Sequence, residues 1–186
     1  PKGARGLEIG CGTGDTLAAL QPAYGVRVDM SPDLIAEAGR LHPDLTFIVG
    51  DAESADTYKE ITGTFDYIIV VDTIGSLDDC QAFMSRLHPL CTRETRIVIG
   101  YFSHLWSPAL KLAELIGKRM PHPPQNALSS DDVGVLANLA NFETVKSEQR
   151  VLMPFSLFGI GRFVNCFISI LPLVRMFALR HYSVCR

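Results

Sequence analysis

Three acidic residues stand where short apolar stretches of the chain end. Asp29 follows residues 24–28, Asp51 follows residues 46–50, and Asp72 follows residues 65–71. Short apolar stretches of this kind are typical of strands in a parallel sheet, and the carboxyl ends of such strands meet at one edge. Carboxylates at that edge can accept hydrogen bonds from ribose hydroxyls and amino groups. The three residues therefore predict a crevice that binds a nucleotide-like ligand.

The segment Glu8–Gly14 supplies the tight turn that such a ligand requires. A short apolar strand runs directly into three glycines, and residues 16–20 are expected to begin a helix. Glycines adopt positive φ angles and let backbone N–H groups approach a ligand at the start of a helix. The spacing Gly-x-Gly-x-Gly differs from the Gly-x-Gly-x-x-Gly of nicotinamide and flavin folds. Asp29 follows Gly10 at about the distance of 20 residues at which a strand-end carboxylate meets a ribose.

Strands and helices are predicted to alternate along the chain. Beyond the segments above, strands are expected over residues 96–101, 143–152 and 181–185, and helices over residues 32–41, 55–61, 108–116 and 131–139. Ser31 is expected to cap the helix 32–41, with Pro32 at its first position. This alternation favours an open, doubly wound α/β sheet with right-handed crossovers.

In four ordered segments the sequence resembles the class I S-adenosylmethionine-dependent methyltransferases. These segments are residues 8–14, 28–32, 50–52 and 65–73, and the match covers residues 5 to about 101. The resemblance implies a three-layer αβα sandwich around a Rossmann-like, seven-stranded, mostly parallel sheet with an antiparallel last strand. It also implies S-adenosyl-L-methionine as the cofactor and S-adenosyl-L-homocysteine as the product.

The resemblance further implies what individual residues do. The backbone from Gly10 to Gly14 would lie along the methionine and ribose part of the cofactor, and Asp29 would accept from two ribose hydroxyls. Met30 would pack on the adenine, Asp51 would accept from its amino group, and Asp72 with Thr73 would border the methionine end and the acceptor. The residues expected to bind the cofactor are Glu8, Gly10, Cys11, Gly12, Gly14, Asp29, Met30, Asp51, Ala52, Asp72 and Thr73. Taken singly, each acid could be a helix cap, and Met30 or Cys11 a buried apolar residue.

The length of the chain indicates a single domain over residues 1–186. Residues 1–101 would form the cofactor-binding half, and residues 102–186 the substrate-side half. Residues 1–99 carry 8 basic and 15 acidic side chains, whereas residues 100–186 carry 9 and 5. The first half therefore has no basic surface of the kind that binds nucleic acid, and no nucleic-acid partner is expected.

The number and spacing of the cysteines indicate the redox state of the cellular compartment. The five cysteines are Cys11, Cys80, Cys91, Cys166 and Cys185, and they form no Cys-x-x-Cys pair. This pattern favours a reducing, cytoplasmic environment and argues against both a disulfide framework and a metal site. The sequence shows no signal peptide. Its first predicted strand begins almost at Pro1, so we expect that helices typical of methyltransferases precede this residue in the whole protein.

The segment 155–179 is apolar, contains Arg162 and Arg175, and has no acid. A membrane-spanning helix needs about 20 mainly apolar residues, and polar residues and a proline interrupt this segment. It could form a peripheral contact with the inner face of a membrane through residues 155–180, a hydrophobic substrate wall, or a homodimer contact. Packing over the sheet is the alternative. The tail also resembles methyltransferases that accompany bacterial cell-surface glycan and lipid-linked sugar synthesis.

These features predict a methyltransferase that acts on a small-molecule or lipid-linked acceptor, with a sugar hydroxyl as one option. His104 follows the strand 96–101 at the carboxyl edge of the sheet and is the first candidate for a general base, ahead of His122, Tyr101 and Asp72. Two alternatives remain open. A nicotinamide-dependent oxidoreductase would use Asp29 but leave Asp51 without a role, whereas a non-catalytic S-adenosylmethionine-binding protein would use the same crevice.

Overall fold

The computed structural model describes residues 3–117, 126, 128–151 and 177–186 of the chain. Its strands are β1 (Arg5–Ile9), β2 (Tyr24–Asp29), β3 (Thr46–Val49), β4 (Phe65–Val71), β5 (Cys91–Phe102), β6 (Thr144–Arg150) and β7 (Arg180–Cys185). Its α-helices are α1 (Asp15–Leu20), α2 (Pro32–Leu41), α3 (Ala55–Glu60), α4 (Cys80–Arg86), α5 (Ser107–Leu115) and α6 (Ser130–Leu139). Short 3-10 helices span Ile74–Ser76 (η1), His88–Leu90 (η2) and His104–Trp106 (η3).

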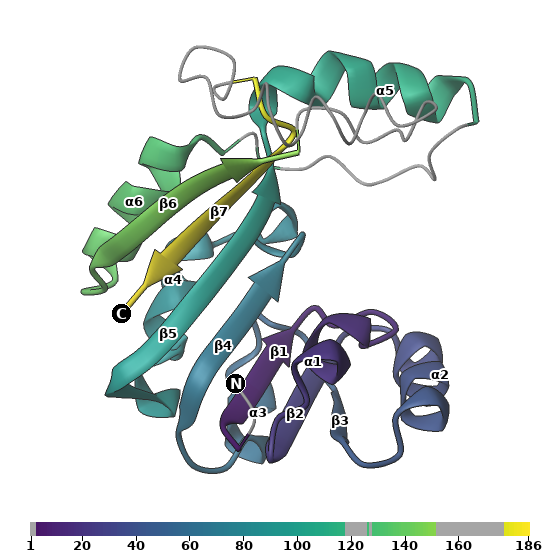
Figure 1. Cartoon of the computed structure of the whole chain (residues 1–186), viewed down its shortest axis with the longest axis vertical. Coiled ribbons are helices and arrows are strands. Elements are labelled where there is room, and N and C mark those ends of the chain that lie inside the picture. The colour runs from purple at the N-terminus through teal and green to yellow at the C-terminus, as the bar shows by residue number, and fades with distance from the viewer. Residues whose placement is uncertain (1–2, 118–125, 127, 152–176) are drawn as a thin grey trace.

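The seven strands form one sheet in the order β3-β2-β1-β4-β5-β7-β6 (Figure 1). Strands β1 to β5 run parallel, and β7 pairs antiparallel with both β5 and β6. The predicted sheet, mostly parallel with an antiparallel last strand, is therefore confirmed. The strand order reverses between β1 and β4, and ligands of open α/β sheets bind beside the carboxyl ends of strands at such a reversal.

Local sequence signals explain several element boundaries. The hydroxyl of Ser31 accepts a hydrogen bond from the Leu34 N–H at the start of α2, and Pro32 occupies the first turn. Ser129 and Asp132 form a capping box at the start of α6. The bounds predicted for the helix 32–41 and the strand 65–71 are confirmed. A cap marks the start of the helix, and the strand is buried from Tyr67 to Val70.

Strands β5 and β6 differ from the prediction by more than one residue at an end. Strand β5 begins at Cys91 rather than at residue 96, because Cys91 pairs with Phe65 across a register shift. The hydroxyl of Thr95 donates to the Phe65 carbonyl at 2.6 Å, so this carbonyl has a hydrogen-bond partner at the register shift. Strand β6 ends at Arg150, because Val151 has a φ of 63°, which an extended strand does not allow.

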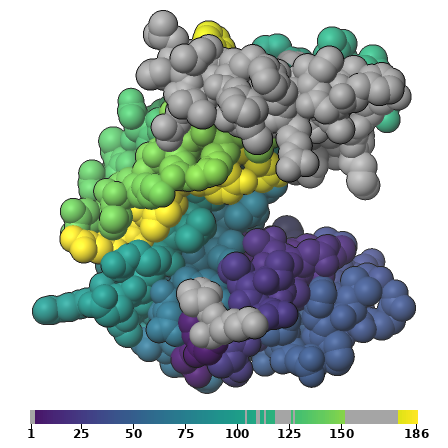
Figure 2. All heavy atoms as spheres, viewed as in Figure 1, coloured from purple at the N-terminus to yellow at the C-terminus, as the bar shows by residue number. Residues whose placement is uncertain are grey.

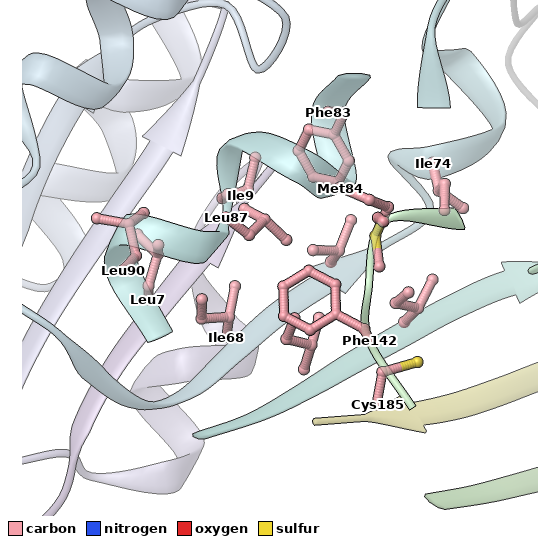
Figure 3. Close-up of a cluster of buried hydrophobic side chains, with 14 of the residues drawn as sticks. Leu7, Ile9, Ile68, Ile74, Phe83, Met84, Leu87, Leu90, Phe142 and Cys185 are labelled. Carbon is pink, nitrogen blue, oxygen red and sulfur yellow. The ribbon is translucent and has the colours of Figure 1, made fainter. Parts of the chain in front are cut away.

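The main core lies between one face of the sheet and helices α3, α4 and α6. Figure 3 shows Phe83 and Met84 of α4, and Leu87 directly after it, in one cluster with strand residues such as Ile68. Phe83 and Ile68 are completely buried. Since burial of one such side chain stabilises the fold by about 1.5–3 kcal/mol, this layer fixes the strands whose ends carry the predicted acids.

The opposite face of the sheet carries α1 and α2. Leu17 of α1 packs against Tyr67 and Ile69 of β4, and all three are buried. Helices thus lie on both faces, and the predicted three-layer arrangement is confirmed. Within the described ranges, no helix is both long enough and apolar enough to cross a bilayer. Most of the predicted apolar segment 155–179 lies outside the described residues.

Candidate functional site

A cavity of about 610 Å³ opens at the carboxyl ends of β1 to β4. In the space-filling view, the surface is hollowed above the purple segment that contains β1 and the glycine loop (Figure 2). The volume falls within the range of about 300–1,000 Å³ found for small-molecule sites. The lining residues are Ile9, Gly10, Gly12, Val28, Asp29, Met30, Gly50, Asp51, Ala52, Glu53, Val71, Asp72, Thr73, Ser76, Leu77, Asp78 and Phe102.

The glycine loop is built from left-handed backbone conformations. Gly10, Gly12 and Gly14 have φ angles of 74°, 52° and 82°. The backbone N–H groups of Gly10 and Cys11 both donate to the Val28 carbonyl, at 2.8 and 3.1 Å. These bonds draw the loop against the end of β2. Residues with a Cβ atom rarely adopt such φ angles, so glycine is needed at these positions.

Gly10 also allows the ends of β1 and β4 to approach each other closely. A Cβ atom at this position would lie 1.8 Å from the Thr73 hydroxyl oxygen. That hydroxyl is 3.1 Å from the Ile9 carbonyl, to which it can donate. Thr73 therefore closes the floor of the cavity between the two central strands.

Asp29 is held rigidly by the loop. Its carboxylate accepts one hydrogen bond from the Gly12 N–H at 2.8 Å and another from the Ser31 N–H at 3.0 Å. Hydrogen bonds to a charged carboxylate are about twice as strong as neutral ones. The bonds orient the side chain at the cavity wall, and each oxygen keeps a further lone pair for a ligand.

Asp51 and Glu53 follow the neighbouring strand β3 and form the next part of the cavity wall. The Asp51 carboxylate accepts from the Glu53 N–H at 2.8 Å. The Glu53 carboxylate accepts from the N–H groups of Asp78 and Asp79 at 3.0 and 2.7 Å. Glu53 thus joins the loop after β3 to the start of α4 and holds that wall in place.

Asp72 lies at the end of β4 and is paired with a residue far away in the sequence. Its two carboxylate oxygens lie 3.1 and 2.8 Å from the two terminal nitrogens of Arg180, at the start of β7. The Arg180 guanidinium lies over the Phe102 ring, 4.5 Å from its centre. This ion pair and Phe102 bound the end of the cavity that faces β5.

Glu8 lies beneath the glycine loop and does not line the cavity. Its carboxylate accepts from the Leu17 N–H at 3.2 Å, in the first turn of α1, and lies 3.6 Å from the Arg27 Nε atom. Burial raises the pKa of Glu8, although the nearby Arg27 acts in the opposite direction. Burial also lowers the pKa of Arg27. Glu8 therefore links the end of β1 to the start of α1 and to Arg27 of β2, and so supports the glycine loop.

Cys11 also does not line the cavity, and the residue is buried. Burial, together with the negative charges of Asp29 and Glu8, raises the pKa of Cys11 to about 12. The side chain is therefore a neutral thiol near pH 7. A role as a thiolate nucleophile does not fit this environment, since the thiolate is the reactive form.

The cavity brings together most of the residues that sequence reasoning selected. Those that line it are Gly10, Gly12, Asp29, Met30, Asp51, Ala52, Asp72 and Thr73, whereas Glu8, Cys11 and Gly14 do not. His104 begins η3, two residues after the end of β5, but its side chain lies outside the described part of the structure. His122 lies outside the described residues. Tyr101 is buried in the core and does not line the cavity.

Sequence reasoning missed several lining residues. Phe102 and Val71 are the last residues of their strands, a position that could have indicated the cavity. Glu53 follows the predicted Asp51 by two residues, and Asp78 precedes the cap of α4. No local feature of the sequence around Arg180 indicates that its side chain would pair with Asp72.

Comparison with a family model provides independent information on this region. Residues 7–94 match the model of a family described as a methyltransferase domain. The matched range contains the glycine loop and the strand-end acids Asp29, Asp51 and Asp72. It thus includes every residue that lines the cavity except Phe102.

Two curated relatives are similar to the chain over part of their length. Norajmaline N-methyltransferase from Rauvolfia serpentina is 31% identical over 107 residues, which cover 53% of this chain and 36% of that protein. Demethylmenaquinone methyltransferase from Beutenbergia cavernae is 29% identical over 133 residues, which cover 69% of this chain and 54% of that protein. The matched part of the chain therefore spans about a third and about half of their lengths.

Solved structures define the class of fold. An S-adenosylmethionine-dependent methyltransferase from Mesorhizobium loti superimposes with a TM-score of 0.72 at 12% identity, covering 100% of this chain and 91% of that one. Magnesium protoporphyrin IX methyltransferase from Synechocystis, with bound S-adenosylhomocysteine, superimposes with a TM-score of 0.62 at 16% identity. This match covers 99% of this chain and 74% of that one. The chain thus has the fold of S-adenosylmethionine-dependent methyltransferases, with a methyltransferase-domain match over residues 7–94.

Proposed function

We propose that the cavity binds S-adenosylmethionine and that the chain transfers its methyl group to an acceptor. The observation that carries the proposal is the convergence of Asp29, Asp51 and Asp72 with the glycine loop on one cavity. Asp29 would accept from the ribose hydroxyls, since its carboxylate is fixed by the loop. Asp51 would accept from the adenine amino group. The methyltransferase-domain match and the fold support the same assignment.

Met30 supports the fit of an adenine ring. Its side chain lines the cavity and is 75% exposed, which is unusual for a large apolar residue. A planar ring placed against it would cover this apolar surface, and the polarizable thioether suits contact with an aromatic system. Met30 would thus form one side of the adenine site.

The charge of the cavity argues against a nicotinamide dinucleotide. The lining contains Asp29, Asp51, Glu53, Asp72 and Asp78, and among the described residues that line it none is Lys or Arg. Arg180, which bounds one end of the cavity, is paired with Asp72 and so offsets only that carboxylate. A diphosphate would be repelled by these carboxylates, whereas a sulfonium cation would be attracted. We therefore favour S-adenosylmethionine over the oxidoreductase alternative.

Methyl transfer would require alignment more than protein-based covalent chemistry. When bound, S-adenosylmethionine supplies an electrophilic methyl group and a good leaving group. The residues of the chain would orient the ligand and exclude water from it. His104 remains the proposed general base for a hydroxyl acceptor, because it follows β5 at the carboxyl edge of the sheet. In His104→Ala we expect methyl transfer to fall with cofactor binding intact, and unchanged turnover would remove this role.

For the acceptor, we propose a small molecule or a lipid-linked compound. Neither name among the two curated relatives, norajmaline N-methyltransferase and demethylmenaquinone methyltransferase, refers to a protein or nucleic-acid acceptor. A sugar hydroxyl would be one acceptor group. Peripheral membrane contact through residues 155–180 would be tested by sedimentation with anionic liposomes, and no association at low salt would contradict it.

Two measurements separate the proposal from its alternatives. S-adenosylhomocysteine should raise the melting temperature of the chain, whereas NADH should not. Transfer of a labelled methyl group to pools of small-molecule and lipid acceptors should then yield product. Stabilisation by NADH alone would favour the oxidoreductase. Binding without transfer to any pool would favour a non-catalytic S-adenosylmethionine-binding protein.

A further inference from the structure

The ion pair between Asp72 and Arg180 joins two distant parts of the chain at the edge of the cavity. Both terminal nitrogens of Arg180 bond to the Asp72 carboxylate, at 3.1 and 2.8 Å. Such a two-pronged arrangement fixes the relative orientation of both groups, because the planar guanidinium matches the carboxylate. The side chains of Arg180 and Asp72 are 26% and 36% exposed, so the pair lies at the cavity mouth rather than in the core.

The surroundings hold this pair in place. Arg180 pairs with Phe102 in the antiparallel ladder between β7 and β5, and its guanidinium lies 4.5 Å from the centre of the Phe102 ring. This distance suits a cation–π interaction. On the other side, the Asp72 N–H donates to the Gly100 carbonyl at 2.8 Å, and Asp72 has a φ of 59°. Both partners are therefore fixed by β5, which lies between β4 and β7.

The pair changes the charge balance of the cavity. Five carboxylates line the cavity. Asp72 is paired with a guanidinium. Asp29, Asp51 and Glu53 instead accept hydrogen bonds from backbone N–H groups. Backbone donors orient a carboxylate without cancelling its charge. Arg180 lowers the net negative charge at the Asp72 end.

We infer that Arg180 is a specificity-determining residue that sets how strongly the site prefers a sulfonium ligand to its neutral thioether product. The inference rests on the proposed function, in which Asp72 and Thr73 border the methionine end of the ligand. S-adenosylmethionine and S-adenosylhomocysteine differ there by a methyl group and one positive charge. A charge change at Asp72 therefore alters the affinity for the first ligand more than for the second.

The test compares the two affinities by calorimetric titration of the folded chain. Arg180→Ala leaves Asp72 unpaired and should raise the preference for S-adenosylmethionine over S-adenosylhomocysteine by about threefold to tenfold. Asp72→Asn leaves the guanidinium unpaired and should lower the preference by a similar factor. The double variant removes both charges and should return the ratio to within about twofold of wild type. Each variant would first be checked for an unchanged circular-dichroism spectrum.

Two further variants separate charge from shape. Arg180→Lys keeps the positive charge but not the two-pronged bond, so the ratio of affinities should stay near that of wild type while both affinities decrease together. Arg150→Ala is the matched control, because Arg150 lies opposite Arg180 in the β6–β7 ladder and pairs with Glu148 instead. It should change neither affinity by more than about twofold.

The outcomes distinguish this inference from the proposed function. If wild type binds both ligands and the ratio stays within twofold in Arg180→Ala and in Asp72→Asn, the pair does not set the preference and the inference is wrong. If the pair has a purely structural role, its loss should lower the affinities for both ligands equally and leave their ratio unchanged. If folded wild type binds neither ligand, the proposed function itself fails.

Discussion

The Arg27 Nε atom and the Glu8 carboxylate lie 3.6 Å apart beneath the glycine loop, and their side chains are only 0% and 4% exposed. None of the three Arg27 guanidinium nitrogens has a hydrogen-bond partner among the described residues. A Cβ atom at Gly14 would lie 2.2 Å from an Arg27 nitrogen. The floor of the loop thus consists of a buried ion pair packed against the backbone, and Glu8 supplies the negative charge closest to Arg27.

Removing one member of this pair should destabilise the fold strongly. Glu8→Ala leaves a buried guanidinium without a counter-charge, and we expect a loss of about 3–5 kcal/mol in the free energy of unfolding by urea denaturation. It also removes the acceptor for the Leu17 N–H at the start of α1. Glu37→Ala, which breaks the exposed ion pair with Arg40, should leave the urea midpoint close to that of wild type.

A double replacement tests whether charge or packing matters. Glu8→Leu combined with Arg27→Met removes both buried charges while keeping apolar volume, and such changes are often neutral or stabilising. We expect the double variant to be markedly more stable than Glu8→Ala. A double variant as unstable as the single one would show that the ion pair is not the source of the loss.

Gly10→Ala should disturb the cavity and the fold together. The new Cβ atom would lie 1.8 Å from the Thr73 hydroxyl oxygen, at a φ of 74°. We expect a loss of at least about 2 kcal/mol in the free energy of unfolding, from the left-handed backbone and the steric clash. Affinity for S-adenosylhomocysteine, measured by calorimetry, should fall at least about tenfold.

Gly134 provides the matched control for that substitution. It lies within α6, and a Cβ atom there would meet nothing within 4 Å. Gly134→Ala should therefore stabilise the chain by about 0.5–1 kcal/mol and leave ligand affinity unchanged. Equal effects of the two substitutions would contradict the close approach of β1 and β4 described above.

Cys11 should make stability depend on pH above about pH 9. Its pKa of about 12 in the folded chain exceeds the ordinary value of 9.0, so the folded state retains the proton in this interval while the unfolded state releases it. Its contribution is present in full below pH 9 and decreases as the pH rises toward 12. Between pH 8 and pH 10, wild type should lose about 1 kcal/mol more than Cys11→Ala. If the urea midpoints of the two proteins change by the same amount between pH 8 and pH 10, the buried environment of Cys11 is contradicted.

The fold and the strand-end acids could be predicted because their signals are local. Apolar runs, glycines and caps lie within a few residues of one another, and parallel strands bring their carboxyl ends to one edge. The sequence could not indicate that Arg180 would reach Asp72, since 108 residues separate them and their contact depends on how β7 is placed beside β5. Nor could it indicate that Glu8 faces away from the cavity. Strand alternation fixes only that Ile9 and Glu8 lie on opposite faces of β1. The packing of the helices then places Ile9 in the main core and Glu8 on the other face, under α1.

The most direct test of the account is calorimetric titration of S-adenosylhomocysteine into wild type, Asp29→Ala and Asp33→Ala. Asp29 holds the loop through the Gly12 N–H and lines the cavity, whereas Asp33 lies in the exposed first turn of α2. We predict micromolar binding by wild type, an affinity at least about tenfold lower in Asp29→Ala, as expected for lost hydrogen bonds to a carboxylate, and no change in Asp33→Ala. Absence of binding by folded wild type, or equal affinity in Asp29→Ala, would contradict the assignment of the cavity.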